Sequence, residues 1–175
     1  MSIAPISLYP CLFFESQAEQ AARFYTSIFP NSSVETINHF TDTGHEIHKQ
    51  SVGSVMSVAF LLNGAKWVAL NSKPKDIPMN ESVSFQIICE GQEDVDYFWA
   101  KLTAAGEDGA EIDESKQICG WVKDRFGVHW QVVPKVVVDI MCSADADKMN
   151  KTMQAVIKMK KIVVKDILAA IEGKA

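Results

Sequence analysis

Four polar side chains alternate with apolar ones in two segments of strand-like composition, which contain Ser84 with Gln86 and His129 with Gln131. Successive side chains of a strand point to opposite faces of a sheet, so the members of each pair share one face. We expect the apolar faces to lie against helices and the polar faces to converge on a cup that binds a small molecule. A strand with one solvent-facing side gives the same alternation, and the sequence leaves that alternative open.

Two residues of an earlier strand-like segment extend this candidate site. Asn71 ends that segment, and Trp67 lies on the same face as Asn71. We therefore expect both side chains at the rim of the cup. Amides and hydroxyls form hydrogen bonds without titrating, which suits ligand recognition better than acid–base catalysis.

Three histidines, His39, His45 and His48, lie within ten residues of one another. Imidazole is a good ligand for zinc, nickel or iron, and Asp42 or Glu46 could complete a coordination shell. The spacing matches no defined metal loop, however, and polar residues are common at hairpin tips. We therefore assign no metal ligands from the sequence, although a divalent metal remains an open alternative.

The composition limits the class of protein. The chain has 175 residues, 47% of them hydrophobic, and a formal net charge of −5. That balance argues against a nucleic-acid partner, and no apolar run reaches the roughly 20 residues of a membrane-spanning helix. The sequence has no Gly-x-Ser-x-Gly elbow, Gly-rich nucleotide loop or Cys-x-x-Cys pair. With isolated cysteines and no secretory leader in view, we expect a cytoplasmic protein.

The elements that would position these residues occur twice in the same order: a strand, a helix and then further strands. In the first half of the chain we expect a strand at 6–14, a helix that begins at residue 18 and ends before Pro30, and strands at 34–41, 52–62 and 66–71. The second half predicts a strand at 82–89, a helix at 93–104, and strands at 117–123 and 128–133. The buried stripes of the two helices are expected to comprise Ala18, Ala21, Ala22, Tyr25 and Ile28, and Val95, Phe98, Trp99 and Leu102.

Local signals mark several boundaries. Ser16 and Glu19 have the spacing of a capping box for the first helix. Asn63 and Gly64 tolerate positive φ, which predicts a tight hairpin between two strands. A turn with glycine at positive φ is expected at 124–127.

The order of elements predicts an α+β fold made of two βαβββ modules, at 1–72 and 81–136. A polar linker at 73–80 joins them, and a helical tail follows at 137–175. In that tail we expect one basic helix at 144–161 and a shorter one at 162–172. Such a tail is expected to pack on the body of the protein or on a second subunit.

Four segments resemble a known family, in the same order along nearly the whole chain: Gln17–Tyr25, Phe60–Asn71, Asn80–Gln86 and Cys119–Pro134. They are similar to the PhnB-like branch of the glyoxalase, or vicinal-oxygen-chelate, superfamily, which carries the name 3-demethylubiquinone-9 3-methyltransferase. The resemblance implies paired βαβββ modules (glyoxalase/bleomycin-resistance/dioxygenase-like) that form a cupped mixed sheet, followed by C-terminal helices. It also implies a homodimer.

Members of that superfamily hold a divalent metal with His, Gln or Glu and use it as a Lewis acid. Carried over to this chain, the ligand positions fall near Pro10, near Ser82 or Ser84, and at Gln131. Proline has no donor, serine is a poor ligand, and the neutral amide of Gln131 is a weak one. We therefore expect no metal at these positions.

Three functions follow as hypotheses. The first is a metal-independent protein that binds a small molecule through Gln86 and Gln131. The alternative is an enzyme of the superfamily, a metal-assisted lyase, isomerase or dioxygenase, or the methyltransferase of the family name. It would act on a small polar or quinone-like substrate, with His129 or the 39–48 histidines in the site. The third is a structural dimer whose basic tail helix is a contact surface.

Overall fold

The computed structural model describes residues 7–72, 79–106 and 112–174. The chain divides into two units, residues 1–78 and 79–175, and each contains its own mixed sheet. The α+β architecture predicted from the order of elements is confirmed. Most of the linker expected at 73–80 lies outside the described residues. No helix in the described part of the chain is long and apolar enough to cross a membrane.

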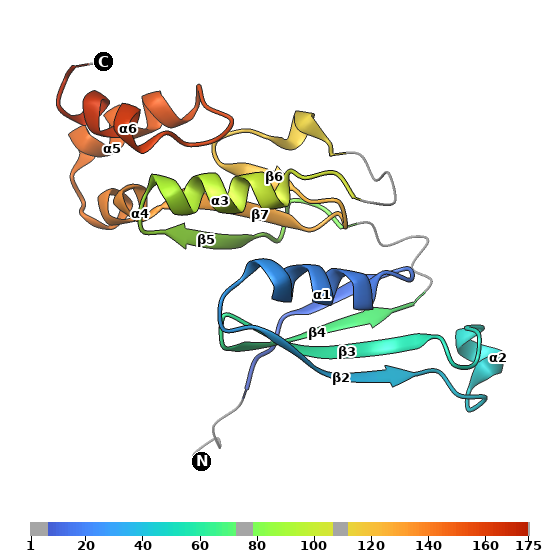
Figure 1. The fold of residues 1–175 in the computed structure, drawn as a ribbon. Coiled ribbons are helices and arrows are strands. Elements are labelled where there is room, and N and C mark those ends of the chain that lie inside the picture. Colours follow the sequence, from blue (N-terminus) through green and yellow to red (C-terminus); the bar gives the residue numbers. More distant parts are fainter. Residues whose placement is uncertain (1–6, 73–78, 107–111, 175) are drawn as a thin grey trace, which may run out of the picture. The chain divides into compact units, whose positions relative to one another are not determined.

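Unit 1 contains a four-stranded sheet and one long helix (Figure 1). Its elements are β1 (Cys11–Phe14), α1 (Ala18–Ile28), β2 (Ser33–His39), α2 (His45–His48), β3 (Val55–Leu62) and β4 (Ala65–Asn71). The strand order is β1-β4-β3-β2, and only the pair β1–β4 is parallel. The crossover through α1 accounts for that parallel pair, because parallel neighbours cannot be joined by a tight turn.

The core of unit 1 lies between α1 and one face of this sheet (Figure 1). All five residues of the predicted α1 stripe are buried, which confirms the helical spacing. The sheet contributes alternate residues of its strands: Leu12, Phe14, Val58, Phe60, Leu62, Trp67 and Ala69. No helix within residues 7–72 lies on the other face of the sheet (Figure 1).

The turn between β3 and β4 is the predicted tight hairpin. Asn63 has φ 48° and Gly64 has φ 78°, and Leu62 pairs with Ala65 across the turn. Positive φ at both central residues is the geometry of a type I′ turn, whose twist matches that of the flanking strands.

The cap of α1 differs from the prediction. No side chain of the preceding residues caps the helix, so the capping box expected from Ser16 and Glu19 is wrong. Asn71 supplies the cap instead: its Oδ1 accepts a hydrogen bond of 2.9 Å from the Ala18 N–H, and its Nδ2 donates one of 3.0 Å to the Val55 carbonyl. Glu19 forms an ion pair with Arg23 one turn along the helix.

Unit 2 has a three-stranded sheet of order β5-β7-β6. Its elements are β5 (Phe85–Cys89), α3 (Gln92–Leu102), a 3-10 turn (Glu114–Lys116), β6 (Trp121–Lys123), β7 (His129–Pro134), α4 (Lys135–Cys142), α5 (Ala146–Val156) and α6 (Val164–Ile171). Strand β5 is parallel to β7, and β6 is antiparallel to it. After α3 the described residues form two strands, where a full βαβββ module has three.

The tail differs from the two helices expected at 144–161 and 162–172. Helix α4 was not predicted, α5 ends at Val156, and residues 159–163 are not helical. The carbonyls of Met159 and Lys160 accept hydrogen bonds of 2.8 Å from the N–H groups of Cys119 and Gly120. The tail nevertheless packs on the body of unit 2, as expected. Its core comprises Val133, Val137, Val156, Ile162 and Ile167.

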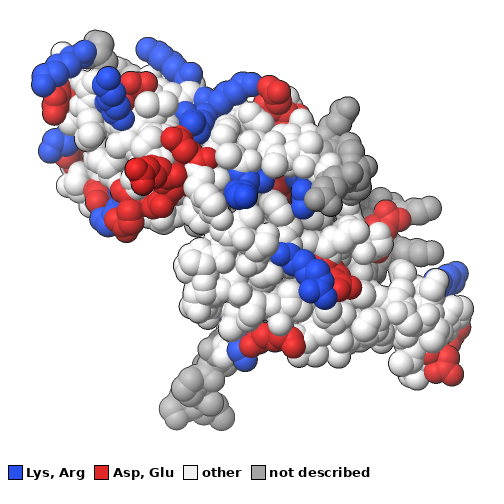
Figure 2. Space-filling model, viewed as in Figure 1, with Lys and Arg blue, Asp and Glu red and all other residues white. Residues whose placement is uncertain are grey.

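The lysines of the tail lie beside acidic groups. Lys151 pairs with Asp147 at 2.8 Å, and Lys160 pairs with Glu114 of the 3-10 turn at 3.0 Å. Positive and negative side chains are mixed over this end of the chain (Figure 2). The basic composition of the tail therefore does not produce a surface of one sign on the face that Figure 2 shows.

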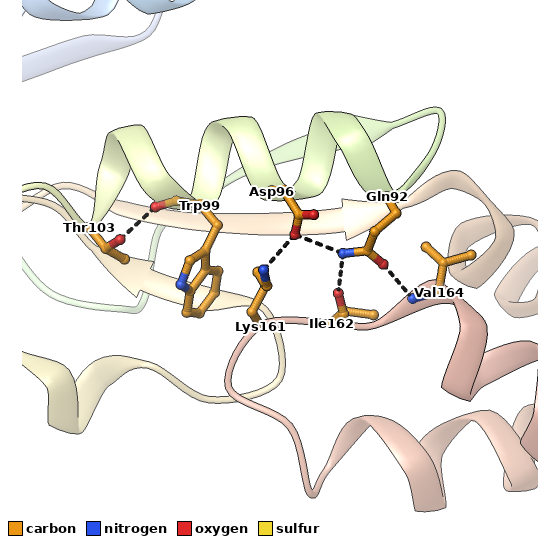
Figure 3. Close-up of polar contacts among 7 residues, drawn as sticks. All are labelled: Gln92, Asp96, Trp99, Thr103, Lys161, Ile162 and Val164. Atoms are coloured by element: carbon orange, nitrogen blue, oxygen red, sulfur yellow. Dashed lines mark hydrogen bonds and ion pairs between the residues drawn. The ribbon is translucent and has the colours of Figure 1, made fainter. Parts of the chain in front are cut away.

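The side chain of Gln92 joins α3 to the non-helical segment of the tail (Figure 3). Its Nε2 donates hydrogen bonds to the Ile162 carbonyl at 3.3 Å and to Asp96 Oδ1 at 3.0 Å, and its Oε1 accepts one of 2.7 Å from the Val164 N–H. The hydrogen bond from Lys161, reinforced by that from Gln92, lowers the pKa of Asp96 below its ordinary value. One amide therefore satisfies two backbone groups that the α5–α6 connection leaves without helical partners.

We predict that Asn71→Ala lowers the free energy of unfolding by about 2 kcal/mol, because it removes a helix cap and leaves a buried N–H and a part-buried carbonyl unpaired. Urea unfolding measures the change. Asn38→Ala is the matched control, since the side chain of Asn38 is exposed and donates a hydrogen bond to Ser57 Oγ, and it should change stability by less than about 0.5 kcal/mol. Equal losses for the two variants would contradict the cap.

Two glycines of unit 2 give a second prediction. Gly127 has φ 86°, as expected for its turn, and a Cβ there would meet nothing closer than 3.9 Å. Gly120 has φ 81°, and a Cβ there would lie 2.7 Å from the Val132 carbonyl oxygen. Gly127→Ala should cost about 1 kcal/mol, whereas Gly120→Ala should cost at least about 2 kcal/mol because backbone must move as well. Urea midpoints that rank the two variants in the opposite order would refute this geometry.

Candidate functional site

The open face of the unit 2 sheet is set by the strand register. Helix α3 lies along the sheet (Figure 1). Ile87, Val122 and Trp130 share one face of the sheet in the strand register, and all three are buried. The residues that alternate with these three along each strand therefore lie on the other face. In the register, Gln86 is opposite Gln131.

Three polar side chains on that face form a hydrogen-bonded ladder. Gln86 Nε2 donates to Gln131 Oε1 at 3.1 Å, and Gln131 Nε2 donates to Ser84 Oγ at 2.7 Å. Gln86 is exposed and Gln131 is half-buried. The structure thus brings together three of the predicted cup residues through direct contacts.

His129 lies on the same strand as Gln131 but is buried, with 4% of its surface exposed. Burial is the main cause that lowers the pKa of His129 below its ordinary value. Glu81 and Asp113 raise this pKa, whereas Lys123 and Lys116 lower it. The imidazole is therefore neutral at pH 7.

The turn between β6 and β7 is held by the carboxylate of Asp124, which is itself buried. Its Oδ1 accepts hydrogen bonds from the N–H groups of Phe126 and Val128 at 2.8 and 3.0 Å. Its Oδ2 accepts one of 2.8 Å from Trp130 Nε1. These bonds fix the hairpin that places Gln131 opposite β6.

Trp67 and Asn71 occupy a different position from the one predicted. Both belong to unit 1 and lie on the face of β4 that packs against α1, where Trp67 contacts Phe60 with ring centroids 6.2 Å apart. Asn71 is engaged as the cap of α1. The expectation that these two side chains line the open rim is corrected. Trp67 and Asn71 do share one face of β4, but that face packs against α1 and is not the open one.

The three clustered histidines do not form a coordination shell. Nδ1 of His48 accepts a hydrogen bond of 3.0 Å from the Gln50 N–H, so its Nε2 carries the proton and donates to the Thr43 carbonyl at 3.2 Å. Both ring nitrogens are thereby engaged. Within residues 7–72, 79–106 and 112–174 there is no group of three His, Cys, Asp or Glu side chains that could hold a metal ion.

The divalent metal of the superfamily does not fit the residues at the ladder. Ser84, Gln86 and Gln131 are neutral, and each uses part of its hydrogen-bonding capacity on another member of the ladder. A divalent cation in such a site would lack anionic or imidazole ligands. We therefore derive no step through a metal.

Trp121 is a residue of this face that the sequence analysis missed. It is opposite Gln131 in the β6–β7 register, and its side chain is half-buried. The signal was present in the alternation of Trp121 with Val122, because an apolar residue beneath the helix requires its neighbours to face the other way.

Comparisons with known proteins give a consistent result. A family model described as 3-demethylubiquinone-9 3-methyltransferase matches residues 7–133. No curated protein matches. The chain is similar to a solved structure from Bacillus cereus, a PhnB protein that bears the same methyltransferase name. The two are 27% identical with a TM-score of 0.58, over 74% of this chain and 99% of that one.

A protein from Pseudomonas aeruginosa is 15% identical, with a TM-score of 0.53 over 74% of this chain and 98% of that one, and supports the fold alone. The family model covers most of the chain, including β1 to β4 of unit 1 and the ladder residues of unit 2. The chain therefore belongs to the PhnB-like family described as 3-demethylubiquinone-9 3-methyltransferase.

Proposed function

We propose that this protein binds a small neutral molecule on the open face of the unit 2 sheet, and that no metal takes part in binding. The observation that carries the proposal is the ladder of Ser84, Gln131 and Gln86, with contacts of 2.7 and 3.1 Å. The ladder orients two amides on a rigid sheet, and such pre-organised polar groups reduce the entropy lost when a ligand binds.

Neutral amides favour recognition over catalysis at this face. Gln86 and Gln131 neither donate nor accept a proton near neutral pH, so they cannot act as a general acid or base. His129 is neutral at pH 7 but exposes only 4% of its surface, which limits its access to a substrate. These two observations support a binding protein over the alternative of an enzyme.

We propose further that the protein is a homodimer. The unit 1 sheet face opposite α1 carries the apolar side chains Cys11, Phe13, Ala59, Leu61, Val68 and Leu70, of which Phe13 is 40% exposed. Lys66 and Ser57 lie on the same face at the edges of this apolar patch. Apolar surface in water is stabilised by burial against another surface, and a second copy of the chain supplies one. The four cysteines are free, which supports a cytoplasmic location.

The absence of a metal requirement is testable by calorimetry. After dialysis against EDTA, titration with Zn²⁺, Ni²⁺ or Mn²⁺ should show no stoichiometric binding, because Ser84, Gln86 and Gln131 provide no charged ligand. Native mass spectrometry of the same sample should give the mass of a metal-free dimer. One metal per chain with a micromolar or lower dissociation constant would overturn this part of the proposal.

Binding itself is tested with cyclohexanecarboxamide, a saturated neutral amide, in an NMR titration that follows the side-chain amide signals of glutamine. We predict that Gln131→Leu weakens binding at least fivefold, because it removes the central member of the ladder. The free energy of unfolding should fall by less than about 1 kcal/mol, since Ser84 and Gln86 can turn to water.

Gln154→Leu is the matched control, because Gln154 is an exposed glutamine of α5. It should leave the affinity for cyclohexanecarboxamide unchanged. If the probe shifts no signal of Gln131, or if both variants bind it as the wild type does, the proposed binding site is wrong.

A further inference from the structure

Three side chains of unit 2 occupy one row across its three strands. Gln131 of the central strand β7 is opposite Gln86 of β5 on one side and opposite Trp121 of β6 on the other. Residues directly opposite one another in a sheet share a face, and in an antiparallel pair their Cβ atoms lie roughly 4.5–5.5 Å apart. The indole of Trp121 therefore borders the amide ladder.

The side chain of Trp121 is only partly buried. Val122, the next residue of β6, is fully buried on the face that α3 covers, whereas Trp121 is half-buried on the opposite face. Tryptophan presents a large apolar ring and a single N–H donor. An aromatic surface beside a few fixed polar groups is the usual composition of a small-molecule site.

We propose that Trp121 determines ligand specificity by stacking on a planar ring, whose amide or lactam edge forms hydrogen bonds with Gln86 and Gln131. This inference rests on the proposed function and adds the chemical class of the ligand: a neutral, conjugated ring that carries an amide. Offset stacking requires a flat partner, so a saturated ring with the same amide loses that part of the interaction.

The hydrogen-bonding capacity left in the ladder fits such an edge. Gln131 Oε1 accepts from Gln86, and Gln131 Nε2 donates to Ser84. Gln86 Nε2 therefore retains one N–H, and Gln86 Oε1 accepts no hydrogen bond from the described residues. An amide or lactam offers a donor and an acceptor side by side, which complements one N–H and one carbonyl oxygen.

The rows of residues on either side of this one differ in polarity. On one side, Lys123 is opposite His129, and Ser84 lies toward the same end of β5. On the other side, Ile88 is 45% exposed and is opposite Val133, which is buried in the core of the tail. The row of Gln86, Gln131 and Trp121 thus separates a polar end of the face from an apolar end, as a ligand with one polar edge and one apolar ring requires.

The test compares benzamide with cyclohexanecarboxamide, which carry the same primary amide on a planar and on a saturated ring. NMR titration of the full chain follows the indole N–H signals and the glutamine side-chain amides. The wild type should bind benzamide roughly 3- to 10-fold more tightly, the range expected for one aromatic contact. Trp121→Leu should abolish this preference and change the affinity for cyclohexanecarboxamide by less than about twofold.

Trp121→Phe keeps a flat ring and should retain part of the preference, and it serves if the leucine variant does not fold. Tyr97→Leu is the matched control, because Tyr97 is an exposed aromatic residue on α3. It should leave the preference intact. Thermal unfolding of each variant confirms that folded protein is compared.

Two results would overturn the inference and leave the proposed function standing: equal affinity of the wild type for the two probes, or a preference that survives in Trp121→Leu, provided that Gln131→Leu still weakens binding. If Gln131→Leu has no effect on either probe, or if neither probe binds, the proposed function fails together with the inference.

Discussion

The geometry of the candidate site depends on the buried carboxylate of Asp124. It accepts two backbone N–H groups of its own turn and the indole N–H of Trp130, and hydrogen bonds to a charged group each contribute roughly 1.5–3 kcal/mol. Those bonds fix which residue of β7 stands opposite which residue of β6. A slip of one residue would send every side chain of β7 to the other face, so that Gln131 would lie under α3 and Trp130 in water. One carboxylate therefore decides that Trp121 and Gln131 share the open face.

Elements with strong periodicity or with turn chemistry could be predicted from the sequence. The α1 stripe repeats at helical spacing over eleven residues, and Asn63-Gly64 encodes its own turn. The errors fall where distant residues decide the local structure. Residues 159 and 160 read as helix by composition, but their carbonyls bond to a turn forty residues earlier in the chain. Helix α4 has only eight residues, three of them consecutive valines, which locally favour a strand.

The site could be predicted in part, for a related reason. The alternation of polar and apolar residues in these two segments was sufficient to place Ser84, Gln86 and Gln131 on one face, because apolar residues stand between the polar ones. Alternation cannot say which face of a strand a helix covers, and that choice was wrong for β4. Asn71 faces α1 because the helix needs an acceptor for its first N–H groups, a requirement that only the folded backbone reveals. The alternation of Trp121 with Val122 could place Trp121 on the face opposite Val122, but only the β6–β7 register shows that it lies beside Gln131.

The amide at position 131 changes what the sheet face can do. In the superfamily that the sequence resembles, one of the metal-ligand positions falls at Gln131. A carboxylate that a ligand buries must be compensated by a cation, and without one its desolvation costs several kcal/mol. Burying a neutral amide costs far less free energy. A ligand that displaces water from the amide can replace the lost hydrogen bonds with its own. A face of this kind needs no counter-ion before binding. In the proposed function, selectivity depends on the shape and hydrogen-bond geometry of the ligand. The register of β5, β7 and β6 fixes the positions of the side chains that would recognise it.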